Sequence, residues 1–265
     1  MAKEFVDIAK LKNSAALPTD LIAIYADVKL VDVREEEKVF TSSLYTVVGV
    51  LMDGSKRNLL CRSVADRENL DGWRGVFKNL LERGVRRVLL VVHDDFTGLA
   101  KLSKSLFPQS DIQLCTVHML RNARTHLGAE LAREFKDRFT ALRNSTSFEK
   151  AKPQFDALLT DFSKHAPAFI DHLRSNPDAY LQCVKYPRRI RASFSTSNAV
   201  EAVNGQLERL RRNSGGYFQS QDSLTTKLGI TFDILETTSW KKPSANFAAS
   251  LAELRLLHSA RFEAE

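Results

Sequence analysis

The stretch from Arg87 to Leu99 reads RVLLVVHDDFTGL, and it decides the fold class of this 265-residue chain. Five consecutive aliphatic residues, Val88 to Val92, are typical of a strand that is covered on both faces. Two acidic residues, Asp94 and Asp95, follow this strand almost directly. Open α/β sheets place their chemistry in the crevice at the carboxyl ends of such strands. The stretch therefore predicts an α/β fold and makes Asp94 a candidate metal ligand.

The residues before this strand predict an antiparallel meander. Apolar and polar residues alternate over 21–33, which indicates a half-buried strand with Asp27 on its more polar face. Asp53-Gly54 is a strong hairpin signal between two further strands. The elements expected after the first strand are strands over 44–52 and 58–64, a helix over 70–83, a strand over 87–92, a helix over 98–106, a strand over 112–116 and a helix over 117–127. This order predicts a mixed sheet with helices packed on it.

The second half of the chain changes character. From residue 128 to about 190, apolar side chains recur at helical spacings without strand-like alternation, which predicts an all-helical insertion. A helix ending at Arg212 follows, with Glu201 beside its apolar stripe, and helices are expected over 224–235 and 247–262. The expected organisation is a lead-in over 1–20, the first part of the core over 21–127, the insertion over 128–194, and the last part of the core with C-terminal helices over 195–265.

Positive charge is concentrated in one tract of this basic chain, which carries a net charge of +7. Seven basic residues and two acidic residues lie between Lys185 and Arg212. Such a tract is either a solvated face or a surface that follows a phosphate backbone, and its closeness to Glu201 favours DNA. The candidate DNA-binding residues are Lys185, Arg188, Arg189, Arg191, Arg209, Arg211 and Arg212.

Other classes of protein are disfavoured by what the sequence lacks. No stretch approaches the roughly 20 apolar residues of a membrane span, and the first residues do not resemble a secretory signal. Three widely spaced cysteines argue against a disulfide framework. We therefore expect a cytoplasmic, nucleoid-associated protein with no membrane partner.

Several segments resemble successive motifs of the Mutator-type bacterial insertion-sequence transposases, an Asp-Asp-Glu family. The resemblance covers roughly residues 20 to 235, and the Cys-x-x-His-x-x-Arg-Asn and Thr-x-Asn-x-x-Glu motifs are specific in combination. The matching segments are 73–84, VVHDDFTGL at 91–99, Phe107-Pro108, QLCTVHMLRN at 113–122, TSNAVEAVN at 196–204, 211–218 and Asp222-Ser223.

The resemblance implies a ribonuclease H-like mixed-sheet core with an all-helical insertion between the second catalytic Asp and the Glu. Carried over by motif, the catalytic and metal-binding triad is Asp27, Asp94 and Glu201, and the cofactor is a pair of Mg²⁺ or Mn²⁺ ions. The implied activity is hydrolysis of a phosphodiester at the ends of a mobile element, followed by strand transfer into target DNA. The implied partners are element ends and target DNA, with copies of the chain assembling on the DNA.

Five residues of the matching motifs are expected to support the active site: Cys115, His118, Arg121, Asn122 and Asn198. The Cys-x-x-His spacing also fits half of a zinc site, but no second pair is evident, so a positioning role is favoured. A buried thiol and a core imidazole remain the structural alternative. Arg121, Asn122 and Asn198 are ambiguous between DNA contacts and helix caps. Trp73 is expected in the core, and Trp240 against DNA.

The sequence also departs from the family pattern. Asp95 stands where the family usually has Gly, and it either perturbs the turn or adds a metal ligand. The family's N-terminal DNA-binding region is largely lacking, so a truncated product is expected. The alternative function is a catalytically inactive or truncated DNA-binding remnant that regulates a full-length transposase. A small-molecule enzyme is disfavoured because no Gly-rich phosphate loop follows a strand.

Overall fold

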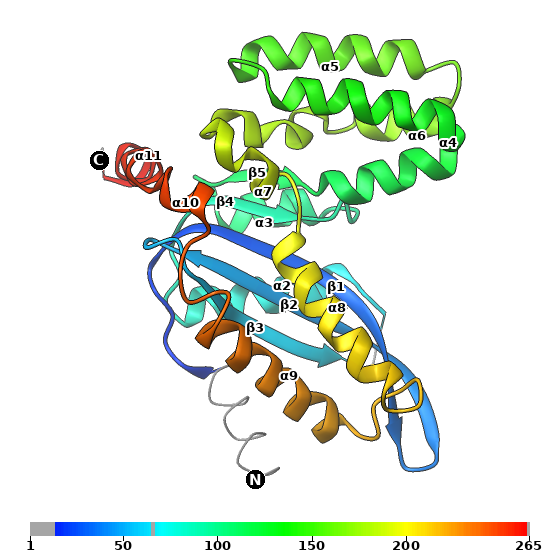
Figure 1. Cartoon of the computed structure of the whole chain (residues 1–265), viewed down its shortest axis with the longest axis vertical. Helices are drawn as coiled ribbons and strands as arrows, with labels where there is room; N and C mark the ends of the chain where they lie inside the picture. Colours follow the sequence, from blue (N-terminus) through cyan, green and yellow to red (C-terminus); the bar gives the residue numbers. More distant parts are fainter. Residues whose placement is uncertain (1–13, 65–66, 264–265) are drawn as a thin grey trace.

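A five-stranded mixed sheet forms the centre of the computed structural model, which describes residues 14–64 and 67–263 (Figure 1). The strand order is β3-β2-β1-β4-β5. β2 pairs antiparallel with both β1 and β3, whereas β4 runs parallel to β1 and β5 runs parallel to β4. The strands are β1 (Asp20–Glu35), β2 (Lys38–Leu51), β3 (Lys56–Val64), β4 (Arg87–His93) and β5 (Asp111–Leu114). The predicted mixed sheet is confirmed.

Helices cover both faces of this sheet. The helices α2 (Leu70–Glu82) and α3 (Leu99–Leu106) bury Trp73, Phe77 and their neighbours against one face. The other face is covered by α8 (Asn198–Arg212), α9 (Gln221–Thr237) and α11 (Leu251–Phe262). The remaining helical elements are α4 (Thr116–Arg143), α5 (Phe148–Phe162), α6 (Pro167–Arg174), η1 (Pro177–Tyr180), η2 (Gln182–Lys185), η3 (Arg188–Ile190), α7 (Arg191–Phe194) and α10 (Ala245–Ala248).

The chain leaves the sheet layers through a break in α4. Gly128 has φ 76° and ψ 174°, a backbone conformation that residues with a Cβ atom rarely adopt. The first helical segment of α4 therefore ends at residue 127, where the sequence predicted a helix end. A second helical segment then runs to Arg143. It packs against α5 and α6 through aromatic contacts, with the Phe135 and Phe162 ring centroids 5.3 Å apart. Helical elements alone occur within the described residues 128–194, as predicted, and they form the upper part of Figure 1.

Three expectations are wrong in detail. β2 begins at Lys38 rather than at residue 44, because its extra residues pair with the far end of β1 in a tight hairpin. The single C-terminal helix expected over 247–262 is divided into α10 and α11. Trp240 does not face DNA: it is 4% exposed and packs near Phe232, whereas Trp73 lies in the core as expected. In the part of the chain that the structure describes, no helix has both the length and the apolar character of a membrane span.

Candidate active site

Two of the predicted acids lie on neighbouring parallel strands. Tyr25 of β1 lies opposite Val92 of β4 in the parallel register. Asp27 is two residues after Tyr25 and Asp94 is two residues after Val92, so the two acids lie next to each other. Asp27 is inside β1 and is only 5% exposed, and Asp94 comes directly after β4, which ends at His93. The sheet therefore brings the two carboxylates to the same place.

Glu201 reaches this place from a distant part of the sequence. It lies in the first turn of α8, a helix that packs on β1. The entry to α8 is tied to the start of α4, because the Thr116 backbone N–H and its hydroxyl both donate to the Ser195 carbonyl, at 2.8 and 2.9 Å. The Cys115 Sγ also lies 3.3 Å from the Ser197 Oγ. These contacts hold the Cys-x-x-His segment and the Glu201 turn together.

The three acids share one electrostatic environment. Burial is the largest cause that raises the pKa of Asp27 to about 7, and the negative charges of Asp94 and Glu201 raise it further. The charge of His118 acts in the opposite direction. In addition, the Asn204 amide donates to Asp27 Oδ2 at 2.9 Å. Asp27 is thus a buried carboxyl group surrounded by negative charge, with one oxygen held by an amide.

His118 forms an ion pair with Asp94. Its Nδ1 contacts Asp94 Oδ1. Burial alone would lower the pKa of His118, but the interactions with Asp94 and Cys115 outweigh it and raise the pKa to about 10. Ligand atoms of Asp94, Cys115 and His118 lie within 4.8 Å of one another, which is close enough for a metal site. Because the Nδ1 atom of His118 contacts an Asp94 oxygen, this contact orients the Asp94 carboxylate.

Asp95 has a role that the sequence did not suggest. Its Oδ2 accepts a hydrogen bond from the Tyr180 hydroxyl at 2.6 Å and lies 2.7 Å from His172 Nε2. Both partners belong to the all-helical segment between α4 and α8. Asp95 therefore attaches this segment to the end of β4, one residue after Asp94.

A cavity of about 210 Å³ opens beside Asp94. Its walls come from the core, through Glu68, His118 and Asn122, and from the helical segment, through His172 and Tyr180. Asn122 lines the same cavity as Asp94. Arg121 and Asn198 are exposed, and no hydrogen bond of either side chain to the acids is found among the described residues.

Two residues near the acids were missed by the sequence reasoning. Asn204 lies one helical turn after Glu201, so its spacing on α8 was an available signal. Glu68 precedes α2 and carries no local signal, because only the folded chain brings it to the cavity that Asp94 lines.

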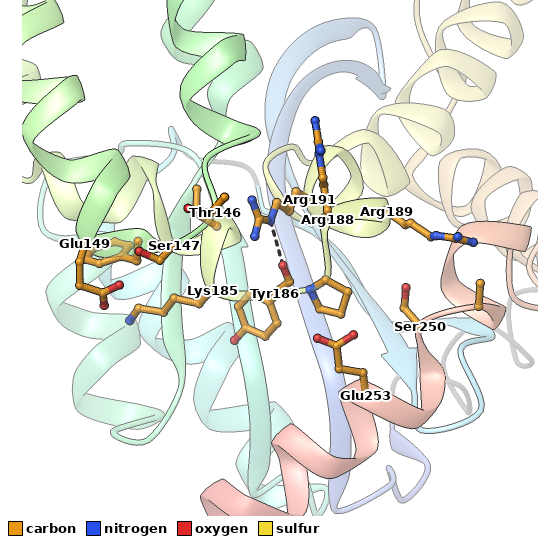
Figure 2. A pocket seen from close by; sticks show the side chains of 14 residues that line it. Thr146, Ser147, Glu149, Lys185, Tyr186, Arg188, Arg189, Arg191, Ser250 and Glu253 are labelled. Atoms are coloured by element: carbon orange, nitrogen blue, oxygen red, sulfur yellow. Dashed lines mark hydrogen bonds between the residues drawn. The ribbon is translucent and has the colours of Figure 1, made fainter.

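The seven predicted DNA-binding residues form two separate groups. Lys185, Arg188, Arg189 and Arg191 border a cavity of about 610 Å³ (Figure 2). Arg209, Arg211 and Arg212 lie in the last turn of α8. A helix of this length measures roughly 22 Å at 1.5 Å per residue, so the two groups do not form one continuous stripe. Glu208 pairs with both Arg211 and Arg212.

Arg191 does not belong to the exposed set. It is 8% exposed, and its guanidinium donates to the carbonyls of Tyr186, Arg143 and Ser145 at 2.8, 3.0 and 2.6 Å. These bonds use three of its five N–H donors inside the protein, and with its burial they correct its assignment from DNA binding to a structural role. Arg188 and Arg189 are exposed and extend away from Arg191 (Figure 2).

Comparison of this chain with known protein families and structures identifies its family. The family model described as "Transposase, Mutator family" matches residues 11–242. The chain therefore belongs to the Mutator family of transposases. A "Probable transposase for insertion sequence element" of Corynebacterium diphtheriae is 26% identical over 204 residues, which are 77% of this chain and 59% of the relative. The "Transposase for insertion sequence element ISRM3" of Rhizobium meliloti (strain 1021) is 24% identical over 240 residues, 90% of this chain and 59% of the relative.

The chain spans only part of each of these relatives. A third, the "Transposase for insertion sequence element IS1201" of Lactobacillus helveticus, is 23% identical over 87% of this chain and 62% of its own length. Among solved structures, the "Drosophila P element transposase strand transfer complex" matches 96% of this chain and 77% of that chain, with 12% identity and a TM-score of 0.30. A likeness at that level carries no argument about this chain.

Proposed function

We propose that the chain is the catalytic domain of a DNA transposase with a ribonuclease H-like core. It hydrolyses a phosphodiester at the ends of a mobile element and transfers the freed strand into target DNA. The observation that carries this proposal is the convergence of Asp27, Asp94 and Glu201, three carboxylates from distant segments that share one electrostatic environment in a transposase-family chain.

The donor set suits a divalent metal. Mg²⁺ and Mn²⁺ favour carboxylate oxygens, and the acids here supply oxygens from β1, from the end of β4 and from α8. Burial first, and then the charges of Asp94 and Glu201, raise the pKa of Asp27, so a bound cation would stabilise its ionised form. We assign Asp27, Asp94 and Glu201 as the ligands of a pair of ions.

Each surrounding residue has a role in this proposal. The bound ions would activate the attacking oxygen and stabilise the leaving one. His118 holds one oxygen of Asp94, and Asn204 holds one oxygen of Asp27, so the other oxygens of both carboxylates are oriented. Cys115, through its contact with Ser197, fixes the start of α8 and hence Glu201.

DNA is the proposed partner, through its phosphates. Arg188 and Arg189 lie before α8 and Arg209 and Arg212 lie at its end, and all four side chains are exposed. Guanidinium groups bind phosphate oxygens without reading base sequence. We also expect copies of the chain to assemble on DNA, which sedimentation of the protein with and without a DNA end would measure.

The test compares three variants with the wild-type protein on labelled duplex DNA with Mn²⁺. Asp94→Asn and Glu201→Gln should abolish nicking while DNA affinity, measured by fluorescence anisotropy, stays within about twofold. Each removes a metal-binding charge and no basic group. Asp137→Asn, at an exposed position of α4, is the matched control and should nick like the wild type.

Two results would reject this assignment. Wild-type nicking by both acid variants would show that the acids are not ligands. A wild-type protein that binds DNA and never cleaves it would favour the alternative, a catalytically inactive DNA-binding remnant.

A further inference from the structure

Glu68 occupies a rigid position at the edge of the cavity beside Asp94. It precedes α2, and the next residue, Asn69, is fixed twice: its backbone N–H donates to the Tyr45 hydroxyl at 3.2 Å, and its side chain caps Gly72 N–H at 2.7 Å. A Cβ on Gly72 would lie 2.4 Å from the Tyr45 hydroxyl oxygen, so this packing tolerates little movement. The backbone beside Glu68 is therefore well defined.

The Glu68 carboxylate is held through one of its oxygens. The indole N–H of Trp73, a residue that is 1% exposed in the core, donates to Glu68 Oε1 at 2.7 Å. This bond leaves Oε2 available to a ligand. A carboxylate with one oxygen fixed by a buried donor is the arrangement that orients metal ligands in proteins.

Glu68 and Asp94 line the same cavity of about 210 Å³. A water molecule takes about 30 Å³ of liquid, so this space accommodates a cation with several of its waters. Burial raises the pKa of Glu68 and the negative charge of Asp94 raises it further, whereas the hydrogen bond from Trp73 and the charge of His118 act in the opposite direction. His118 also lines this cavity and already places one positive charge beside Asp94, and a divalent ion with Glu68 and Asp94 as carboxylate ligands would add to it.

We propose that Glu68 is a fourth carboxylate ligand of the active site, binding a divalent ion on the side of Asp94 that faces this cavity. This inference rests on the proposed function, because it assigns a ligand to the same site. The competing explanation is that Glu68 only satisfies the indole N–H of Trp73.

The experiment measures Mn²⁺ binding directly, by the electron paramagnetic resonance signal of free Mn²⁺ in titrations of the full chain without DNA. Glu68→Gln removes the charge and keeps an amide oxygen as acceptor for Trp73, whereas Glu68→Ala removes both. Glu82→Gln, at the exposed end of helix α2, which Glu68 precedes, is the matched control. Asp94→Asn reports on the site as a whole, and circular dichroism melting verifies that each variant is folded.

Both Glu68 variants should lose Mn²⁺ affinity by at least about tenfold, the scale seen for groups that support metal sites, and Glu82→Gln should bind like the wild type. If Glu68→Gln binds like the wild type while Asp94→Asn is impaired, the inference is wrong and the proposed function stands. The same holds if only Glu68→Ala is impaired, because the role is then structural. A wild-type chain without Mn²⁺ affinity, or an unimpaired Asp94→Asn, overturns the metal site itself and this inference with it.

Discussion

Asp94 and Asp95 are adjacent in the sequence, yet the fold gives them opposite tasks. Both residues follow the end of β4 and line the same cavity, but they have different partners. Asp94 meets His118 of α4, while Asp95 meets Tyr180 and His172 of the helical segment. Asp94 is a ligand in the proposed chemistry, and Asp95 binds Tyr180 and His172, which line the cavity.

Asp95→Ala should therefore weaken the attachment of the helical segment. The variant leaves the Tyr180 hydroxyl and His172 without their acceptor, which should lower the free energy of unfolding by about 1–3 kcal/mol. Hydrogen exchange should become faster in α6 and η1 before it changes in the sheet. Urea unfolding and exchange mass spectrometry measure both effects, with Asp137→Ala as control, and an unchanged unfolding midpoint would contradict this role for Asp95.

The sequence predicted three acids as candidate ligands but not all of the residues that surround them. Asp94 follows a run of aliphatic residues, and Glu201 lies in a motif, so local patterns single them out. Asn204 and Asp27 meet across 177 residues of sequence, and Tyr180 and Asp95 across 85. Contacts between residues so far apart depend on tertiary packing and cannot be predicted from a local sequence pattern.

At the scale of elements, the short edge strand β5 is held by a network of charges. Asp111, at its start, accepts hydrogen bonds from the Tyr186 hydroxyl at 2.8 Å and from Arg261 of α11 at 2.9 Å. Lys185 contributes a third contact at 3.1 Å. One side chain thus joins the sheet to the C-terminal helix and to the end of the helical segment.

Asp111→Asn should destabilise the protein in a pH-dependent way. Burial alone would raise the pKa of Asp111, but the charges of Arg261 and Lys185 outweigh it, so the pKa lies below its usual value. A lowered pKa adds stability above the unfolded value of about 3.9, and this stability is lost as the pH falls towards the folded value. Urea unfolding should therefore show a wild-type advantage at pH 7 that shrinks below pH 4. An advantage that grows in acid would contradict the assignment.

The order and type of the elements were predictable, because periodicities of hydrophobic residues are local. The end of the helix at Gly128 was also visible, since glycine tolerates a positive φ. The extension of β2 and the separation of α10 from α11 were not, because strand pairing and packing on the sheet decide them. The predicted boundaries of these elements were wrong because tertiary contacts, and not the local sequence pattern, determine them.

At the scale of the whole molecule, positive charge flanks α8 at both ends. Arg188 and Arg189 are exposed before it, and Arg209 and Arg212 are exposed at its end, whereas Arg191 is internal. The two groups should contribute separately to binding, because each neutralised phosphate adds about −0.9 to the slope of log affinity against log salt.

Replacing Arg188 and Arg189 by Ala should flatten this slope by up to about two units, and replacing Arg209, Arg211 and Arg212 by up to about three. Arg211 is also paired with Glu208, so the second change should fall short of its limit. Arg191→Ala should leave the slope unchanged and lower the thermal stability, since three carbonyls lose their donor. Fluorescence anisotropy between 50 and 200 mM salt measures the slopes, and an Arg191 effect equal to that of the exposed pairs would contradict the corrected placement.

The wide separation of the three acids along the chain has a consequence during synthesis. β1 and β4 leave the ribosome long before α8, because translation proceeds from the N-terminus. Under the proposed function, a nascent polypeptide that carries Asp27 and Asp94 without Glu201 lacks a complete catalytic site and cannot cleave DNA. A premature stop codon or frameshift before α8 likewise yields a product that lacks Glu201 and, under the proposed function, nuclease activity.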